Sequence, residues 1–207
     1  MKDKPNLIFD CDGTLIDSYG AITKKVYECF LSLGYEYDIS EIRELCLFGT
    51  VDTCLETLAK RSGVSIETAT AAYKATPEKR DMITLYDGVK ELLQSERFDC
   101  FVYTHRGISS LEIFEKLGIL PYFTEIVNSS YNLKRKPDKE GISYLVSKYK
   151  LDLKKTFYVG DRAIDMECGK NAGVGTIFID SAKLKISTKN ADFVIEKFSD
   201  IYDVLTK

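Results

Sequence analysis

Four carboxylates stand at two places in the chain where a short apolar run ends. Asp10 and Asp12 are two residues apart in FDCDGT, and Asp161 and Asp165 are four apart in YVGDRAID. A spacing of two in an extended backbone turns both side chains to one side, and a spacing of four does so on a helix. Four gathered acids repel one another unless a cation binds, and oxygen ligands favour Mg²⁺. The pattern predicts a magnesium site if the fold joins the two places.

Each acid pair also has a structural explanation. The first pair fits a solvated turn or the start of a calcium-binding loop. That loop requires glycine at its sixth position, whereas Gly13 is fourth and Leu15 is sixth, so the calcium loop is excluded. The second pair fits the start of a helix, where the helix dipole favours carboxylates. Neither pair alone decides its function.

Two other residues are of types that bind anions. Thr104 ends the apolar run CFVYT ahead of a helical pattern, where a hydroxyl and the following backbone N–H groups can receive a phosphate. Lys136 precedes Pro137 in a loop that leads into the helical pattern GISYLVSKY. The structural alternatives are a helix-capping threonine and a solvated lysine. Their order relative to the acids gives these residues weight.

Six short apolar runs must position these side chains. They are NLIF, CFVYT, EIVNSS, TFYVG, GTIFI and DFVI, which begin at residues 6, 100, 125, 156, 175 and 192. Runs this short and continuous indicate strands buried on both faces. Helical patterns lie between most of them, and Gly118 stands where a left-handed helix terminator belongs. The alternation predicts an α/β, Rossmann-like parallel sheet with helices on both faces and a ligand site at its carboxyl edge.

The stretch from 17 to 85 departs from this alternation. It contains no convincing strand, and its four helical patterns are separated by glycine and proline. We therefore predict an inserted all-helical domain over residues 17–85. The catalytic core is predicted to comprise residues 1–16 and 86–207.

Composition narrows the choice of partners. The 207 residues are 44% hydrophobic and 29% charged, as in globular domains, and the formal net charge is −3. Such a charge attracts neither nucleic acid nor an anionic membrane, so we expect neither as a partner. No run approaches the roughly 18 apolar residues of a membrane span. The six cysteines include no CxxC pair, so we expect reduced core thiols and a cytoplasmic location. We expect the protein to be a monomer or a weak homodimer.

Taken in order, the motifs resemble those of the haloacid dehalogenase (HAD)-like hydrolase superfamily. The paired-Asp strand end, the Thr strand end, the Lys-Pro loop and the Gly-Asp strand end match its four motifs over essentially the whole chain. The helical insertion lies where the phosphoglycolate phosphatase and beta-phosphoglucomutase-like branch carries its cap domain. The resemblance implies a Mg²⁺-dependent phosphatase that hydrolyses a small phosphorylated metabolite through an aspartyl-phosphate intermediate.

The resemblance also implies a role for each acid. Asp10 is the expected nucleophile, and Asp12 is the expected general acid and base. The expected metal site comprises Asp10, Asp12, Asp161 and Asp165, with Asp12 contributing its backbone carbonyl. Asp165 is expected to act on the metal directly or by supporting the other ligands.

Three residues are expected to bind the phosphate. Thr104 would hold the phosphoryl oxygens, and Lys136 would steady the negative charge around the nucleophile and the phosphate. Both are counted as catalytic. His105 stands where many relatives have asparagine, and its backbone N–H is expected to contact the phosphate. Whether its imidazole touches the substrate is left open.

Three other functions compete with this one. A mutase of the beta-phosphoglucomutase type returns the phosphoryl group to a sugar, but such enzymes usually have a histidine soon after the first motif, and DSYGAIT has none. A dehalogenase lacks the second acid of the first motif. A receiver-like signalling domain also forms an aspartyl phosphate, but it has no helical insertion. Hydrolysis is the expected reaction.

Overall fold

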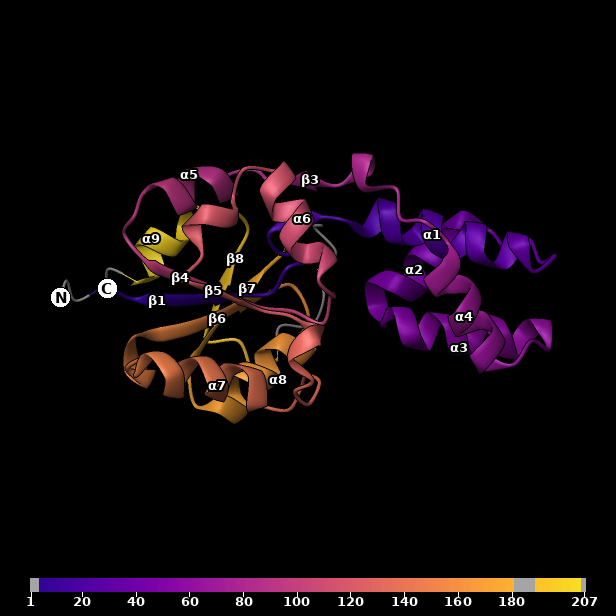
Figure 1. Cartoon of the computed structure of the whole chain (residues 1–207). Coiled ribbons are helices and arrows are strands. Elements are labelled where there is room, and N and C mark those ends of the chain that lie inside the picture. The colour runs from indigo at the N-terminus through magenta and orange to yellow at the C-terminus, as the bar shows by residue number, and fades with distance from the viewer. Residues whose placement is uncertain (1–3, 181–188, 206–207) are drawn as a thin grey trace. The chain divides into compact units, whose positions relative to one another are not determined.

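A six-stranded parallel sheet forms the centre of the larger of two compact units (Figure 1). The structure is a computed structural model that describes residues 4–180 and 189–205. Every neighbouring pair of strands is parallel, in the order β5-β4-β1-β6-β7-β8. The strands are β1 (Asn6–Phe9), β4 (Asp99–Tyr103), β5 (Glu125–Val127), β6 (Thr156–Gly160), β7 (Gly175–Ile179) and β8 (Phe193–Ile195).

Helices cover both faces of this sheet, as expected for parallel strands joined by crossover connections. One face carries α5 (Val89–Gln94), α6 (Ser109–Lys116) and α9 (Asp200–Leu205) (Figure 1). The other carries α7 (Glu140–Tyr149) and α8 (Ala163–Ala172). Short 3₁₀ helices occur at Arg80–Met82, Leu120–Tyr122, Ser129–Tyr131 and Leu153–Lys155.

The central strand β1 sets the level of the site. Its four residues are all buried, so its continuous apolar run is explained by helices on both sides. Phe9 at its end is in register with Val102 of β4 and Val159 of β6. The three strands therefore end at the same edge, and the residues that follow them emerge close together.

Close packing of α7 against β4 supports that edge. A Cβ atom at Gly141 in α7 would lie 2.3 Å from the ring of Tyr103 in β4. Only glycine allows α7 to approach the strand so closely. This packing places the loop before α7 beside the end of β4.

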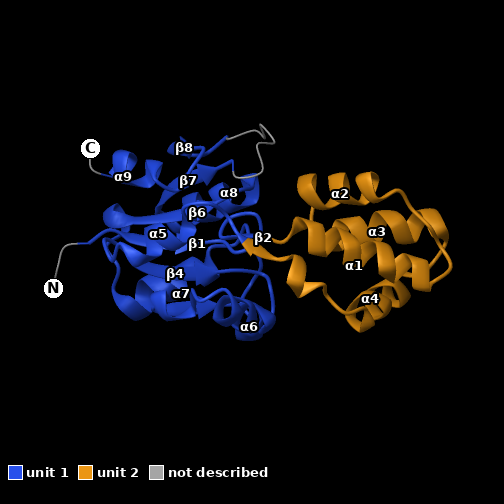
Figure 2. Cartoon of the chain, turned by 90° about the horizontal axis from the view of Figure 1, so that it is seen from above, with its two compact units in different colours: residues 1–16, 85–207 blue, residues 17–84 orange. Residues whose placement is uncertain are grey.

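The second unit, Asp17–Thr84, is helical (Figure 2). Its core is built around the buried side chains of Val26, Phe30 and Leu58. Asp38, Thr50 and Ser65 each cap a helix by accepting backbone N–H groups from its first turn. The helices are α1 (Tyr19–Ser32), α2 (Ile39–Phe48), α3 (Val51–Ser62) and α4 (Ile66–Ala75).

The α/β, Rossmann-like architecture predicted from the sequence is confirmed, and all six predicted strands are present. Gly118 ends α6 in the left-handed region, with φ of 70°. Two predictions were wrong in detail. The run EIVNSS leaves the sheet after Val127, because Ser129–Tyr131 forms a 3₁₀ turn. The stretch predicted to lack strands touches two short ones at its ends, β2 (Ile16–Asp17) and β3 (Thr84–Leu85), which pair with each other.

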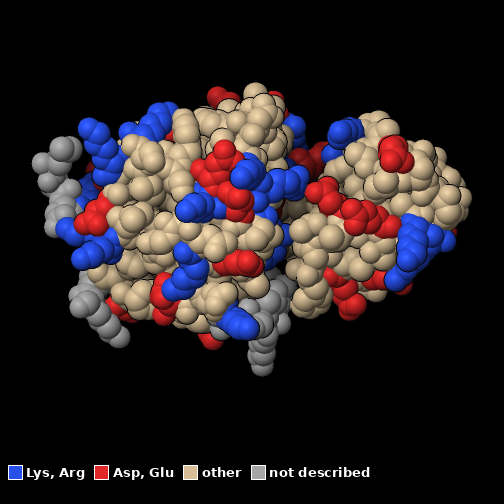
Figure 3. Space-filling model, turned by 90° about the horizontal axis from the view of Figure 1, so that it is seen from below, with Lys and Arg blue, Asp and Glu red and all other residues tan. Residues whose placement is uncertain are grey.

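The two compact units are 1–16 with 85–207, and 17–84. Residues 1–3, 181–188 and 206–207 of the predicted catalytic core lie outside the described residues. On the face shown in Figure 3, acidic and basic side chains are interspersed. Within the described part of the chain, each helix is too short or too polar to cross a membrane.

Candidate active site

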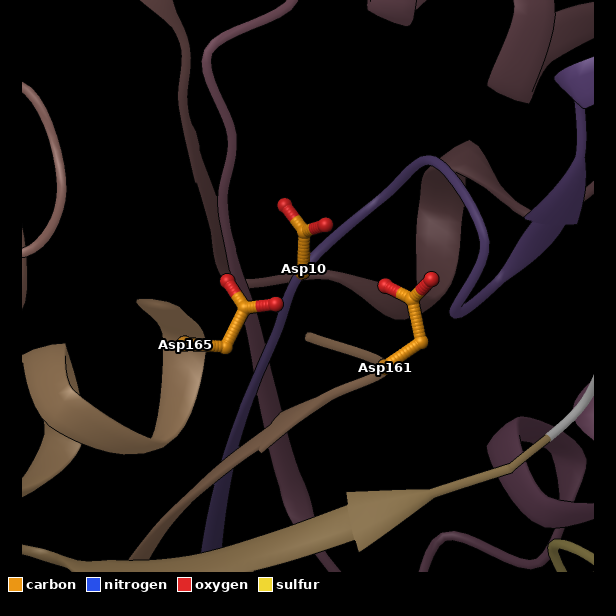
Figure 4. Close-up of side chains that lie close together, drawn as sticks. All are labelled: Asp10, Asp161 and Asp165. Atoms are coloured by element: carbon orange, nitrogen blue, oxygen red, sulfur yellow. The ribbon is translucent and has the colours of Figure 1, made fainter. Parts of the chain in front are cut away.

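Three acids from the two predicted motifs meet at the carboxyl edge of the sheet (Figure 4). Asp10 follows β1, Asp161 follows β6, and Asp165 lies in the first turn of α8. One carboxylate oxygen of each lies within 4.8 Å of the others, and all three side chains are buried. Buried carboxylates this close together require cations. The structure thus brings together acids that lie more than 150 residues apart in the sequence.

Lys136 supplies one such cation. Its Nζ lies 2.5 Å from Oδ1 of Asp10 and 2.7 Å from Oδ1 of Asp165, and its side chain is only 1% exposed. The ammonium also lies 5.3 Å from the ring centroid of Tyr103 and 5.2 Å from that of Tyr158. Aromatic faces stabilise a buried cation. The alternative of a solvated loop lysine is therefore wrong.

The ionisation of these groups follows from burial and mutual contact. Burial raises the pKa of Asp10 to about 6, although the ammonium of Lys136 opposes the shift. Burial acts in the same direction on Asp165, but Lys136 and Arg162 outweigh it, so the pKa of Asp165 is lowered. Burial alone would lower the pKa of Lys136, but Asp10 and Asp165 raise it. Lys136 therefore stays charged, and both acids are ionised above about pH 6.

The local sequence holds each acid in place. The hydroxyl of Thr14 donates to Oδ1 of Asp161 at 3.2 Å. The backbone N–H of Arg162 donates to Oδ2 of Asp165 at 3.2 Å, which ties that side chain to the start of α8. A Cβ at Gly160 would lie 2.4 Å from Cβ of Asp165, so glycine is required there. These contacts explain the spacing of Gly160 and the two acids in YVGDRAID.

Asp12 lies in a different setting. Arg106 holds its carboxylate through Nε, 3.0 Å from Oδ1 and 3.1 Å from Oδ2, and through Nη2, 2.5 Å from Oδ1. The Asp12 side chain is 24% exposed, against 4% for Asp10. Its carboxylate is thus engaged by a guanidinium, so its expected contribution to the metal site falls on the backbone carbonyl alone.

Thr104 and His105 leave the end of β4 beside the loop of Lys136. The backbone N–H of Thr104 continues the sheet by donating to the carbonyl of Val127 at 2.9 Å. Its hydroxyl accepts the N–H of Arg106 at 3.1 Å. The helix-cap alternative for Thr104 is wrong, because α6 begins only at Ser109.

The imidazole of His105 turns toward the loop of Lys136. Its Nε2 accepts the backbone N–H of Lys136 at 2.8 Å. Burial, together with the nearby cations of Lys136 and Arg135, lowers the pKa of His105 to about 3. A cavity of about 330 Å³ lies beside these residues, lined by Tyr103, Thr104, His105, Asn128, Ser129, Asn132, Leu133 and Arg135.

Sequence reasoning missed the partners of the predicted residues. Arg106 stands two positions after Thr104 in THRG. A basic residue so soon after a predicted anion-binding position could have indicated a role in the site. Tyr158, whose hydroxyl lies 3.4 Å from Oδ1 of Asp165, is part of an apolar strand run and gave no signal. The imidazole contact of His105 needs the fold, because 31 residues separate the two partners.

The donor set fits a small divalent cation. Asp10, Asp161 and Asp165 carry three negative charges and Lys136 one positive charge, so two negative charges remain among these four side chains. All the donors of the acids are oxygens, which are the ligands that Mg²⁺ prefers. Asp10 and Asp161 would hold the ion, and Asp165 lies within reach of the same place.

Comparisons with known proteins identify the class. The family model for haloacid dehalogenase-like hydrolase matches residues 7–179, so the chain belongs to that family and is a hydrolase. It is 25% identical to a phosphoglycolate phosphatase of Vibrio parahaemolyticus, over 99% of this chain and 97% of the relative. It is 26% identical to pyrophosphatase PpaX of Listeria monocytogenes, over 96% of this chain and 95% of that protein.

A solved structure supports the fold. The chain is similar to a HAD-superfamily hydrolase of subfamily IA from Geobacter sulfurreducens, with a TM-score of 0.77 and 21% sequence identity. The match covers 98% of this chain and 96% of the other. The resemblance inferred from the four motifs is confirmed.

Proposed function

We propose that this protein is a Mg²⁺-dependent phosphatase that hydrolyses a small phosphorylated metabolite through a phosphoryl group carried on Asp10. The observation that carries the proposal is the position of the Lys136 ammonium, in contact with both Asp10 and Asp165 at the sheet edge. A phosphomonoester carries nearly two negative charges near neutral pH, so a carboxylate attacks it only where positive charge is supplied. The site is built to supply that charge.

Asp10 is proposed to attack the phosphorus in line with the leaving oxygen. Above about pH 6 its carboxylate is ionised, and Lys136 keeps one oxygen oriented. The attack forms an Asp10 acyl phosphate and breaks the bond from phosphorus to the leaving oxygen. Mg²⁺ held by Asp10 and Asp161 would neutralise negative charge and polarise the phosphoryl oxygens. The positive ammonium of Lys136 would stabilise the negative charge on the same oxygens.

Asp12 is proposed to handle the proton. It would protonate the leaving oxygen in the first step and take a proton from the attacking water in the second. Its greater exposure than Asp10 fits a group that must reach substrate and water. The Arg106 contact orients its carboxylate, since Nε reaches both oxygens and Nη2 reaches Oδ1.

Thr104 and the backbone N–H of His105 are proposed to hold the remaining phosphoryl oxygens. Both residues follow β4, whose end is in register with the end of β1, the strand that precedes Asp10. Backbone N–H groups at such strand ends bind phosphate without adding a charge of their own.

The substrate is proposed to be small. The relatives are named for phosphoglycolate and for pyrophosphate, both compact anions, and these are the first candidates for this chain. The helical unit is proposed to serve as the cap that sets specificity. A cytoplasmic location is proposed because all six cysteines are free and buried, as suits a reducing compartment. The protein is proposed to act as a monomer or weak homodimer.

The test is a screen of the purified protein against phosphorylated metabolites, including phosphoglycolate, pyrophosphate, sugar phosphates and nucleoside monophosphates. We expect release of many phosphates per chain from at least one small substrate in Mg²⁺, and loss of the activity in EDTA. Full activity after exhaustive EDTA treatment would contradict the metal requirement. Release that stops near one phosphate per chain would favour a signalling domain, and transfer to a second sugar hydroxyl would favour a mutase.

A further inference from the structure

The segment that carries Lys136 is held by side chains. Residues 132–139 belong to no helix or strand. A loop near a buried site must still satisfy its backbone polar groups. Here two contacts come from the end of β4. The Tyr103 hydroxyl donates to the carbonyl of Lys134 at 2.9 Å, and Nε2 of His105 accepts the N–H of Lys136 at 2.8 Å.

Other side chains hold the flanks of this segment. Glu140 accepts the N–H of Lys134 at 2.7 Å, and Nδ2 of Asn171 donates to the carbonyl of Pro137 at 2.9 Å. Of these contacts, only the one from His105 is made to the backbone of Lys136 itself. The position of the Lys136 ammonium therefore depends on it most directly.

We propose that His105 is a positioning residue: its imidazole fixes the backbone of Lys136, so that the ammonium reaches Asp10 and Asp165 together. The two ammonium contacts are 2.5 Å and 2.7 Å, and a misplacement of about 1 Å in a catalytic group can lower the rate about 10²-fold. This inference rests on the proposed function, in which Lys136 steadies the phosphoryl transfer.

The chemistry of the imidazole suits the role. An Nε2 that accepts a hydrogen bond must be unprotonated, so the ring proton lies on Nδ1. Burial and the surrounding cations lower the pKa of His105 to about 3, so the neutral form prevails near neutral pH. The imidazole can therefore accept this hydrogen bond near neutral pH. The backbone N–H of the same residue is the group proposed to contact the phosphate.

The arrangement also joins two parts of the site. The end of β4 is proposed to bind phosphoryl oxygens through backbone N–H groups, and the side chain of His105 leads from there to the Lys136 loop. A shift of one part therefore moves the other. The shorter side chain of asparagine would not reach the N–H of Lys136 from the same backbone position.

Two substitutions test the contact by its geometry. Glutamine places its Oε1 about as far from the backbone as Nε2 of histidine, whereas Oδ1 of asparagine falls at the level of Nδ1. We expect His105→Asn and His105→Ala to lower kcat by about 10- to 100-fold with little change in KM, because the buried N–H of Lys136 loses its acceptor. His105→Gln should restore kcat to within about threefold of the wild type. Equal kcat values for the Gln and Asn variants would overturn the proposal.

Two controls separate positioning from other roles. Lys134→Ala changes an exposed side chain of the same loop and should leave kcat and KM unchanged. Tyr103→Phe removes only the hydroxyl contact to Lys134 and should lower kcat less than His105→Asn does. A large rise in KM for His105→Asn with kcat unchanged would show that the imidazole binds substrate instead.

A double variant completes the test. If His105 acts only through Lys136, adding His105→Asn to Lys136→Ala should cause no further loss of kcat. Additive losses would contradict the proposal. The amide resonance of Lys136 in an NMR spectrum gives a readout that needs no activity, and it should move in His105→Asn and stay in place in His105→Gln. Wild-type protein without any phosphatase activity would instead contradict the proposed function, whatever the resonance shows.

Discussion

The two units bury different kinds of side chain. The larger unit buries Asp10, Lys136, Asp161 and Asp165 at its sheet edge. The helical unit, Asp17–Thr84, buries apolar side chains, and its only buried polar residues are Ser18 and Thr23, with no charge among them. Both units also bury an apolar core, so the buried charges of the larger unit are not explained by packing.

The comparison shows that the larger unit buries charged groups at a cost in folding stability, whereas the helical unit does not. A buried ion pair seldom stabilises a protein more than apolar side chains of the same shape would. The cluster around Lys136 has more acids than cations, so it stabilises the metal-free fold less than an apolar core does. Such an arrangement is explained by binding a cation and an anion, whereas the helical unit needs only its hydrophobic core.

Loss of the buried ammonium is expected to have the largest effect on activity. Lys136→Ala should lower turnover by about 10³-fold in saturating Mg²⁺, because the phosphoryl transfer loses a fixed charge. The control is Lys134→Ala, since that side chain is 73% exposed and two residues away. Steady-state kinetics and circular dichroism check the prediction. Near-normal turnover with an intact fold would mean that the buried ammonium takes no part in the phosphoryl transfer.

The helical unit should respond to a cavity in its core. Phe30→Ala is expected to lower the free energy of unfolding by about 3–5 kcal/mol, because it removes a fully buried ring. Leu31→Ala, at the neighbouring and 47% exposed position, should change it by less than about 0.5 kcal/mol. Urea unfolding gives both values. Similar losses for the two variants would mean that α1 packs differently.

The two acids of the fourth motif should differ in metal dependence. Asp165 is already bound by Nζ of Lys136, the N–H of Arg162 and the hydroxyl of Tyr158. We expect Asp161→Ala to raise the Mg²⁺ concentration for half-maximal activity by about 10- to 100-fold, and Asp165→Ala to raise it less. Magnesium titrations of the two variants decide this. Equal half-maximal concentrations would contradict the ranking.

The raised pKa of Asp10 has a pH consequence. Its value in the metal-free fold is about 6, above its ordinary 3.8, so the folded protein holds a proton that the unfolded chain releases. Protonated Asp10 therefore contributes to the stability of the metal-free fold below about pH 4, and this contribution is lost as the pH rises through 6. Mg²⁺ must displace the same proton, so its affinity should fall about tenfold per pH unit below 6. Calorimetric titrations at pH 5 and pH 7.5 test this, and an affinity independent of pH would contradict it.

The sequence was sufficient for the fold because its signals are local. Short apolar runs ending in Asp10 or Thr104 identify buried parallel strands, and glycine and proline mark the helices of the insertion. The order of the motifs was sufficient for the family. The end of the strand in EIVNSS could not be seen, because Asn128 accepts the N–H and the hydroxyl of Ser130 in a turn that the apolar pattern does not record.

The contacts between groups across the site were beyond sequence reasoning. Arg106 and Asp12 are 94 residues apart, and His105 and Lys136 are 31 apart. Each contact joins separate elements, so spacing along the chain carries no trace of it. Residue types therefore located the chemistry, and only the fold showed which groups hold the reacting ones in place.

The most direct test of the central claim is to trap the phosphoryl group. Asp12→Asn keeps the nucleophile and removes the group proposed to activate water, so the protein should be labelled by a substrate with a good leaving group and release phosphate slowly. Rapid quench and mass spectrometry should find phosphate on Asp10, and none in Asp10→Asn. Label on another residue, or turnover without any acyl phosphate, would contradict the account.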